Sequence, residues 1–427
     1  MTRHASIPGY FALRVLSALI LLKLSTQFLS VHGFANFAQF LAFSSLLNMA
    51  IVGGAQNGLI REAAAASEDE LAAVQGAGLA VWAVATPLIC IPLVILSPQI
   101  SRILTGSSSY WQAVIGLSLL SLAAGPGQVC WSILSGRKRV AQSLGAQSAG
   151  IVVGTTIASW LIVRGSFVGA ALAFATGPLV ATLVALPFAA RLRLSWRPVW
   201  RGVRPLLSYS MAMASTLGFS ALVLFALRSV YREHFGASEL GYWLAANRIS
   251  DMSTQFLGLF MLQAFVPHFA MVADPRQRSG LTLRYGLMGA GLTGAALLVF
   301  LVAARPLVHV FLSDAFVPAI PAIRLYMTGD FLRVWGSLAM FTAFAAGKPG
   351  RYAAIEIGTM TVMAGLTLLL TASGEVRAPQ VAYAASWGLT ALLCGLVLAL
   401  GQLRHRAQSR AHGERRIPLP DSAPRAL

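Results

Sequence analysis

The feature that most constrains this chain is a series of apolar segments, each about 20 residues long. A helix needs about 20 predominantly apolar residues to cross the hydrocarbon core of a bilayer. Only 11% of the residues are charged, against about 25% in typical soluble domains, and the ten-residue alternating strands of a membrane β-barrel are not seen. We therefore predict an all-α polytopic membrane protein with about twelve transmembrane helices, at residues 9–29, 37–60, 76–97, 111–134, 143–163, 166–190, 207–227, 240–265, 285–304, 319–345, 352–372 and 380–402.

The basic residues are unevenly distributed between the two sides of the predicted membrane domain. Of the 32 Lys and Arg residues, 21 fall in segments on one side, six fall on the other side and five lie inside spans. Cytoplasmic loops carry such an excess of Lys and Arg. The net charge of +18 is therefore a topology signal rather than the signature of a nucleic-acid surface. We predict a multi-pass protein of the bacterial inner membrane, with both termini cytoplasmic and no nucleic-acid partner.

The chain divides into two halves of similar length. The segment GFANFAQFLAFSSLLN, which begins at Gly33, is echoed by GASELGYWLAANRIS, which begins at Gly236. Internal repeats are common in transporters, whose substrate sites lie between the halves. Between the halves, RLRLSWRPVWRGVRPLL combines Arg with Trp, and both residue types favour the membrane interface. We predict an N-terminal six-helix lobe at 1–190, a basic interfacial linker at 191–206, a C-terminal six-helix lobe at 207–402 and a disordered basic cytoplasmic tail at 403–427.

Enzyme chemistry finds little support in the sequence. All connections between the predicted spans are short, and the GxxxxGK[ST], H-E-x-x-H and G-x-S-x-G patterns do not occur. The three cysteines, Cys90, Cys130 and Cys394, lie far apart in apolar spans, so they suggest neither a disulfide framework nor a metal site. We expect a protein that is not an enzyme and that has no catalytic residues, no metal and no cofactor.

Charged residues inside the spans are the main candidates for a functional site, because a charge at mid-bilayer costs about 2.5–3.5 kcal/mol on insertion scales. Arg248 and Asp251 lie in the eighth predicted span, and Gln255 follows one turn later. Asp330 and Arg333 lie in the tenth span. Both pairs are spaced i, i+3, so the members of each pair share one helix face. Each pair is compatible with two roles, a salt bridge that clamps helices together or a contact in a hydrated substrate pathway.

The first half of the chain carries only basic residues inside its predicted spans. Arg14 and Lys23 lie nine residues apart in the first span and therefore on different faces. Lys23 has Gln27 one turn on, and we expect Lys23 to line a central cavity. Asn57 lies near the cytoplasmic end of the second span, and Glu356 lies one turn into the eleventh. The spans together hold five bases and three acids, which favours an anionic ligand, because Arg can bind phosphate through two parallel hydrogen bonds.

Three segments together resemble a known family of transporters. They are GAQNGLIREAAA, GASELGYWLAANRISDMSTQF and LSDAFVPAIPAIRLYMTGDFLRVWGSLAMFTAFAAGKPGRYAAIEI. In order and spacing, they are similar to Wzx-type O-antigen and common-antigen translocases of the multidrug/oligosaccharidyl-lipid/polysaccharide (MOP) exporter superfamily. The resemblance implies a flippase with two six-helix lobes around a central cavity. Its substrate would be an undecaprenyl-diphosphate-linked oligosaccharide, moved to the periplasmic leaflet. The resemblance places polar family positions at Asn57, Asp251, Asp330, Arg333 and Glu356.

We expect a substrate cavity lined by polar and charged residues from both halves of the chain. The candidate substrate-binding residues are Lys23, Arg14, Asn57, Arg248, Asp251, Gln255, Asp330, Arg333 and Glu356. The expected partners are the lipid-linked oligosaccharide, membrane lipids and other polysaccharide-assembly proteins. Two alternatives stay open. A cation-coupled multidrug exporter of the same superfamily would need acids in the first-half cavity, and a polytopic polysaccharide polymerase or ligase would need a large outer loop with clustered His and Arg.

Overall fold

The computed structural model is a helical membrane protein. It describes residues 6–48, 50, 55–137, 139–190, 199–200, 202–204, 206, 218–261, 265, 268–269, 272, 274–346 and 348–414. Within these residues every regular element is a helix, which confirms the predicted all-α class. Six of the described helices are long and apolar enough to cross a membrane by length and composition alone. Helices dominate because lipid offers no hydrogen-bond partner to the backbone, so each spanning segment must satisfy its own N–H and C=O groups.

The first half of the chain forms one bundle, which we call the N-lobe. Its helices are α1 (Ser6–Phe28), α2 (Val31–Asn48), α3 (Gln56–Ala65), α4 (Leu71–Ile95), α5 (Ser97–Thr105), η2 (Ser108–Tyr110), α6 (Trp111–Gly136), α7 (Val140–Val163), α8 (Phe167–Ala175) and α9 (Gly177–Ala190). Small residues let α7 and α9 cross closely. A Cβ atom added at Gly150 would lie 2.2 Å from the backbone oxygen of Gly177. Such close crossings are how helices associate in lipid, where burial of apolar surface gives no driving force.

The second half forms a second bundle, which we call the C-lobe. Its helices are α11 (Phe219–Phe260), α13 (Pro275–Val302), α14 (Ala304–Phe311), η5 (Asp314–Ala319), α15 (Ile320–Ala345), α16 (Pro349–Ala372) and α17 (Ala378–Glu414). The long α11 covers the end of the predicted span 207–227 and most of the predicted span 240–265, and the chain turns between them at Gly236. Gly236 has a φ of 85°, a left-handed conformation that glycine adopts without steric cost.

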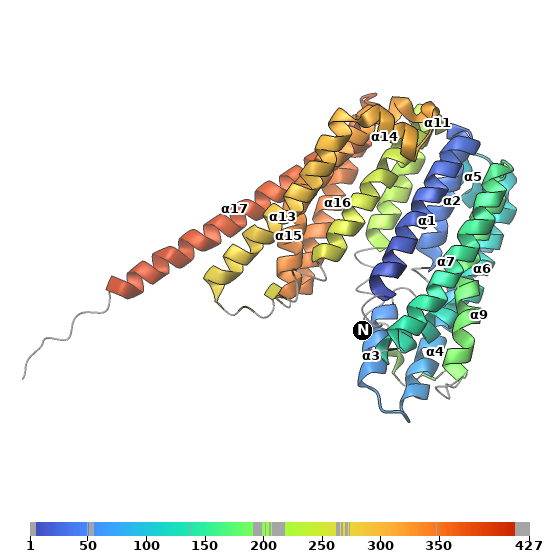
Figure 1. Ribbon diagram of the computed structural model, residues 1–427, viewed down its shortest axis with the longest axis horizontal. Coiled ribbons are helices and arrows are strands. Elements are labelled where there is room, and N and C mark those ends of the chain that lie inside the picture. Colours follow the sequence, from blue (N-terminus) through green and yellow to red (C-terminus); the bar gives the residue numbers. More distant parts are fainter. Residues whose placement is uncertain are drawn as a thin grey trace, which may run out of the picture.

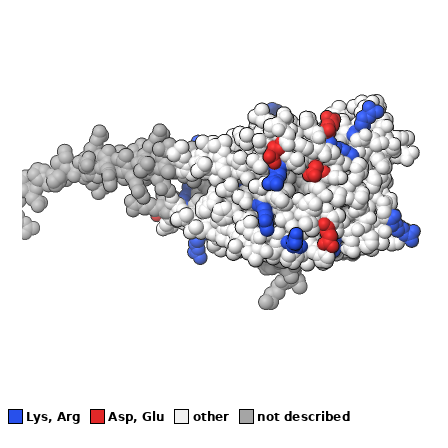
Figure 2. All heavy atoms as spheres, turned by 90° about the horizontal axis from the view of Figure 1, so that it is seen from above, with Lys and Arg blue, Asp and Glu red and all other residues white. Residues whose placement is uncertain are grey.

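The lobes touch at one end of the molecule and separate at the other (Figure 1). Contacts between them run from α1 and α2 to α11 and α14. At this end the ring of Phe34 packs edge-on against that of Phe316, with centroids 5.2 Å apart. We call it the closed end, and the opposite end, where the N-terminus lies, the open end. Figure 2 looks down on the closed end and shows acidic and basic side chains interspersed there.

The C-terminal segment differs from the sequence-based prediction. α17 continues as a helix to Glu414 and extends beyond the bundle (Figure 1), whereas the sequence predicts disorder from residue 403. The helix continues because the segment QLRHRAQSRAH holds no Gly or Pro and is rich in good helix formers. Residues 415–427, and most of the predicted linker at 191–206, lie outside the described residues.

Candidate functional site

A cavity of about 420 Å³ lies between the lobes, on the open-end side of their contacts. Helices α1, α2, α6, α7, α8 and α9 of the N-lobe form most of its wall, and α11 supplies the C-lobe side. Its main polar side chains are Tyr10, Arg14, Gln147, Arg248 and Gln255. Three of them, Arg14, Arg248 and Gln255, are among the residues that the sequence predicts for a substrate cavity.

The two arginines approach this cavity from opposite lobes. Arg14 lies in the first half of α1, and Arg248 lies in α11 beyond the turn at Gly236. Among the described residues that line the cavity, none is Asp or Glu. The lining therefore contributes two basic side chains and no carboxylate, and Asp251 lies just outside it, 4.0 Å from Arg248. Such a site suits a phosphate or another anion, because Arg forms charge-assisted hydrogen bonds with phosphate oxygens.

Asp251 lies beside the cavity rather than among its lining residues. Its Oδ2 atom is 4.0 Å from Nη1 of Arg248, and the side chains are 40% and 37% exposed. The amide of Asn247 donates a hydrogen bond of 3.0 Å to the same oxygen. The predicted i, i+3 pair is therefore present, and it is a loose, partly solvated contact. An ion pair this exposed adds little stability.

Uncharged groups complete the cavity wall, and counting charges in the sequence overlooks them. The hydroxyl of Tyr10 donates a 3.2 Å hydrogen bond to Oε1 of Gln147, which links α1 to α7. Trp131 of α6 also lines the cavity. Aromatic rings and amides of this kind suit the apolar faces and hydroxyl groups of sugars. No spacing rule in the sequence connects Tyr10 with Gln147, since the bond joins residues 137 positions apart.

The second predicted pair lies in a buried network inside the C-lobe. Asp330 of α15 is 0% exposed. Its Oδ1 atom accepts hydrogen bonds of 2.8 Å from Ser250 and 2.8 Å from the hydroxyl of Tyr383. Because a buried carboxylate is costly without donors, these bonds make the position tenable. Ser250 comes from α11 and Tyr383 from α17, so the network ties three helices together.

Arg333 joins the same network through tyrosine. Its Nη1 atom donates a 3.2 Å hydrogen bond to the hydroxyl of Tyr383, and its guanidinium lies 4.8 Å from the ring centroid of Trp387. The sequence predicts a direct pair on one helix face. In the structure the hydroxyl of Tyr383 bridges the two residues, and Trp387 makes a cation–π contact with Arg333, both from α17. Neither Asp330 nor Arg333 lines the cavity as it stands in this conformation.

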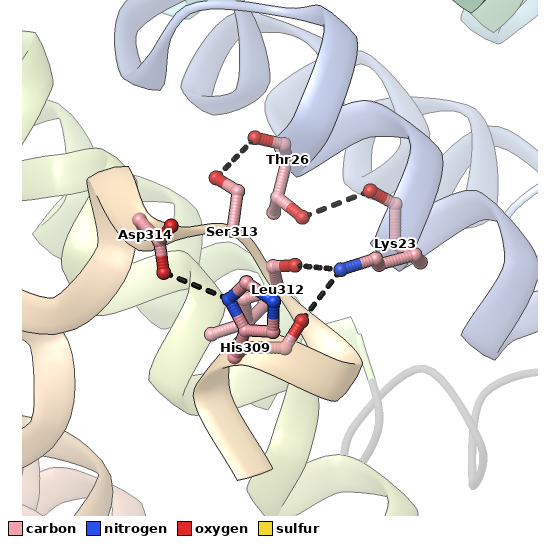
Figure 3. A network of polar contacts seen from close by, with 6 residues as sticks. All are labelled: Lys23, Thr26, His309, Leu312, Ser313 and Asp314. Carbon is pink, nitrogen blue, oxygen red and sulfur yellow. Dashed lines mark hydrogen bonds and ion pairs between the residues drawn. The ribbon is translucent and has the colours of Figure 1, made fainter. Parts of the chain in front are cut away.

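Of the remaining predicted residues, Glu356 and Lys23 are not among the described residues that line the cavity. Glu356 of α16 is half-buried, and its Oε2 atom has no hydrogen-bond partner within the described part of the chain. Asn57 lies in α3, and its side chain falls outside the described residues. Lys23 is not at the cavity wall: its ammonium binds backbone carbonyls near the end of α14 (Figure 3). The expectation that Lys23 lines the cavity is therefore not met in this structure, because α14 offers it acceptors.

In the residues that the structure places, no group of three or more His, Cys, Asp or Glu side chains lies close enough to hold a metal ion. The three cysteines are unpaired thiols, and Cys90 and Cys130 are buried.

Comparisons with known proteins agree with this geometry. The sequence profile of a family described as "Polysaccharide biosynthesis protein" matches residues 26–321. Among solved structures, an inward-facing multidrug resistance MATE family transporter of the MOP superfamily has a TM-score of 0.76 at 15% identity, over 93% of this chain and 95% of that chain.

Two further structures share the fold. The lipid II flippase MurJ in an inward closed conformation has a TM-score of 0.73 at 11% identity, over 93% of this chain and 87% of that chain. A MOP superfamily transporter from Pyrococcus furiosus Vc1, reported with a binding pocket of reverse polarity, has a TM-score of 0.57 at 13% identity over 94% of each chain. No curated protein sequence matches the chain.

Proposed function

Because the chain belongs to the family of polysaccharide biosynthesis proteins and has the fold of MOP transporters, we propose that it is a flippase for a lipid-linked oligosaccharide. It carries an undecaprenyl-diphosphate-linked repeat unit of O-antigen or another surface polysaccharide across the bacterial inner membrane to the periplasmic leaflet. The cytoplasmic side corresponds to the open end, where the predicted excess of Lys and Arg lies.

The observation that carries this proposal is the basic pair in the cavity. Arg14 and Arg248 approach from different lobes, and no carboxylate is found among the described lining residues. A diphosphate has several oxygens, so it can accept hydrogen bonds from both guanidinium groups at once. Asp251 lies 4.0 Å from Arg248 and outside the lining. The undecaprenyl chain stays in the bilayer, while the polar headgroup enters the cavity.

The sugar part of the substrate is assigned to the uncharged wall. Tyr10 and Gln147 are joined by a hydrogen bond, and Trp131 and Gln255 lie in the same lining. Sugars combine apolar ring faces with hydroxyl groups, which aromatic rings and amides can match. Arg333 is half-buried, so in this proposal it contacts phosphate only after the C-lobe rearranges. Asp330 is 0% exposed and acts by holding Tyr383.

The second candidate is a cation-coupled multidrug exporter. It is favoured by the TM-score of 0.76 with a MATE family transporter. A cationic drug would meet Arg14 and Arg248 at the cavity wall, and like charges repel in a site of low dielectric constant. The electrostatics of the cavity therefore favour the anionic substrate. A polysaccharide polymerase or ligase is a weaker alternative, because the related solved structures are transporters.

The experiment uses the purified protein in proteoliposomes loaded with fluorescent undecaprenyl-diphosphate-linked oligosaccharide. Arg14→Gln and Arg248→Gln are each expected to slow translocation about tenfold or more, since a hydrogen bond to a charged group contributes about 1.5–3 kcal/mol. The matched control is Arg351→Gln, which removes an exposed arginine of α16 that does not line the cavity.

Two results would contradict the proposal. The first is wild-type translocation by both cavity variants. The second is transport of a cationic dye by the wild-type protein with no translocation of the lipid-linked sugar, which would establish the drug exporter instead.

A further inference from the structure

Lys23 connects the lobes at the closed end by binding the end of a short helix. Its Nζ atom donates hydrogen bonds of 2.6 Å to the carbonyl oxygen of His309 and 2.6 Å to that of Leu312. His309 lies in the last turn of α14, and Leu312 directly follows that helix. Ser313 adds a 2.6 Å bond from its hydroxyl to the carbonyl of Thr26 in α1. Figure 3 shows the ammonium directed at the two carbonyls.

Arg232 makes the corresponding contact in the opposite direction. It lies in α11, four residues before the turn at Gly236. Its guanidinium donates hydrogen bonds to the carbonyl oxygens of Leu104, at 2.7 Å, and Thr105. These two are the last residues of α5, and Gly106, with a φ of 79°, caps the end of that helix. A C-lobe cation therefore binds the end of an N-lobe helix.

The two contacts occupy equivalent places in the two halves. Lys23 lies near the closed end of the first long helix of the N-lobe, and Arg232 lies near the closed end of the first helical segment of the C-lobe. Each reaches across to a short helix at the closed end, α14 in one case and α5 in the other. α5 follows α4, and α14 follows α13, so both short helices come directly after a long helix.

The physical reason for these partners is the charge at a helix end. The last carbonyls of a helix have no partner within the helix, and the helix dipole places about half a negative charge there. A cation at this point satisfies these carbonyls and is itself satisfied. If the lobes separate at the closed end, all four hydrogen bonds are lost together, and each cation is left beside its own lobe without these acceptors.

We propose that Lys23 and Arg232 form a symmetric pair of interlobe latches that set the population of the conformation closed at this end. Neither Lys23 nor Arg232 is among the residues that line the cavity, so the inference does not depend on which substrate the protein carries. The apolar contact of Phe34 with Phe316 lies at the same end. The test must therefore separate the ionic latches from apolar packing.

The test measures the distance between the lobes directly by pulsed electron paramagnetic resonance in nanodiscs. Spin labels are attached at Ser109→Cys in the N-lobe and Ser373→Cys in the C-lobe, both exposed, after Cys90, Cys130 and Cys394 are replaced by Ser. Lys23→Met and Arg232→Met each remove the charge and leave a long, unbranched apolar side chain. Each is expected to raise the ratio of long to short distances about tenfold, and the double variant about a hundredfold if the latches act independently.

The matched controls are Arg102→Met and Arg305→Met. They remove exposed arginines from α5 and α14 themselves, and the short distance should persist in both. Lys23→Arg and Arg232→Lys keep the charge and should largely restore it. If Lys23→Met does not fold, Arg232→Met decides the outcome alone, because it acts at a separate helix. Unchanged distance distributions in the variants that fold would overturn the proposal and assign closure to the apolar contact.

Discussion

At the scale of single residues, the structure shows how this chain keeps charges in a membrane domain. Asp330 is fully buried, yet it accepts from Ser250 and Tyr383. Arg333 is held by the same tyrosine and by Trp387. The tyrosine hydroxyl thus donates to the acid and accepts from the base at once. This arrangement makes Tyr383 the residue on which the acid and the base both depend.

Tyr383→Phe is therefore expected to lower the free energy of unfolding by about 1.5–3 kcal/mol, because it removes a donor from a buried carboxylate and an acceptor from Arg333. Thermal unfolding in detergent would measure this change. The control is Tyr242→Phe, a partly buried tyrosine whose ring packs on Phe316. An unchanged midpoint for Tyr383→Phe would show that the network contributes nothing to stability.

The exchange of Asp330 and Arg333 addresses their role in transport. Asp330 lies away from solvent and from the cavity lining, so its expected role is structural. Because Arg333 is proposed to contact phosphate after the C-lobe rearranges, the exchanged protein is expected to fold but to lose most of its translocation of the labelled lipid. Translocation close to the wild-type rate by folded exchanged protein would show that the pair is only a clamp.

At the scale of elements, close helix crossings made by small residues add to the apolar packing of the N-lobe. The clearest case is α7 against α9, where Gly150 faces the backbone of Gly177. Helix α7 also contains Gly145, which has open space around its Cβ position. The same helix thus holds one glycine that the packing requires and one that it does not.

Gly150→Ala is expected to destabilise the protein, since its Cβ would meet a backbone oxygen at 2.2 Å, and the helices must move apart. Gly145→Ala should leave stability unchanged or raise it by up to about 1 kcal/mol, because alanine is the better helix former. Thermal midpoints of the two variants would compare them directly. A midpoint for Gly150→Ala at or above that of Gly145→Ala would contradict the inferred crossing.

At the scale of the whole molecule, the two lobes, the closed end and the cavity form one arrangement. The lobes meet near α5 and α14 and separate towards the N-terminus (Figure 1), and the cavity lies between them on that side. In this conformation the cavity therefore lies on the open-end side of the contacts between the lobes.

The orientation of this arrangement can be tested with single cysteines in a chain without native ones. Ser373→Cys, at the closed end, should react with a membrane-impermeant thiol reagent added to intact cells whose outer membrane is permeable to it. Ser67→Cys, exposed between α3 and α4 at the open end, should react only after the inner membrane is permeabilised. The reverse labelling pattern would overturn the predicted cytoplasmic termini.

Some of the site residues predicted from the sequence line the cavity, and others lie elsewhere. Arg14, Arg248 and Gln255 line the cavity. The two arginines could be predicted because a charged residue in a span needs polar surroundings. The sequence does not indicate the uncharged partners in the cavity wall and the buried network, because polar and aromatic residues are common in membrane helices. These partners are Tyr10, Gln147, Tyr383 and Trp387. Lys23 was predicted at the cavity and instead binds α14.

The sequence by itself determined the helices and their placement in a membrane. Both follow from local interactions. About 20 apolar residues span the bilayer, and each spanning segment must satisfy its backbone N–H and C=O groups internally, which a helix does. Only the tertiary structure decided which charges meet. Lys23 and the carbonyl of His309 are 286 residues apart in the chain, and their contact depends on how two separate bundles dock. Such long-range partners are set by packing between lobes, which local sequence patterns do not encode.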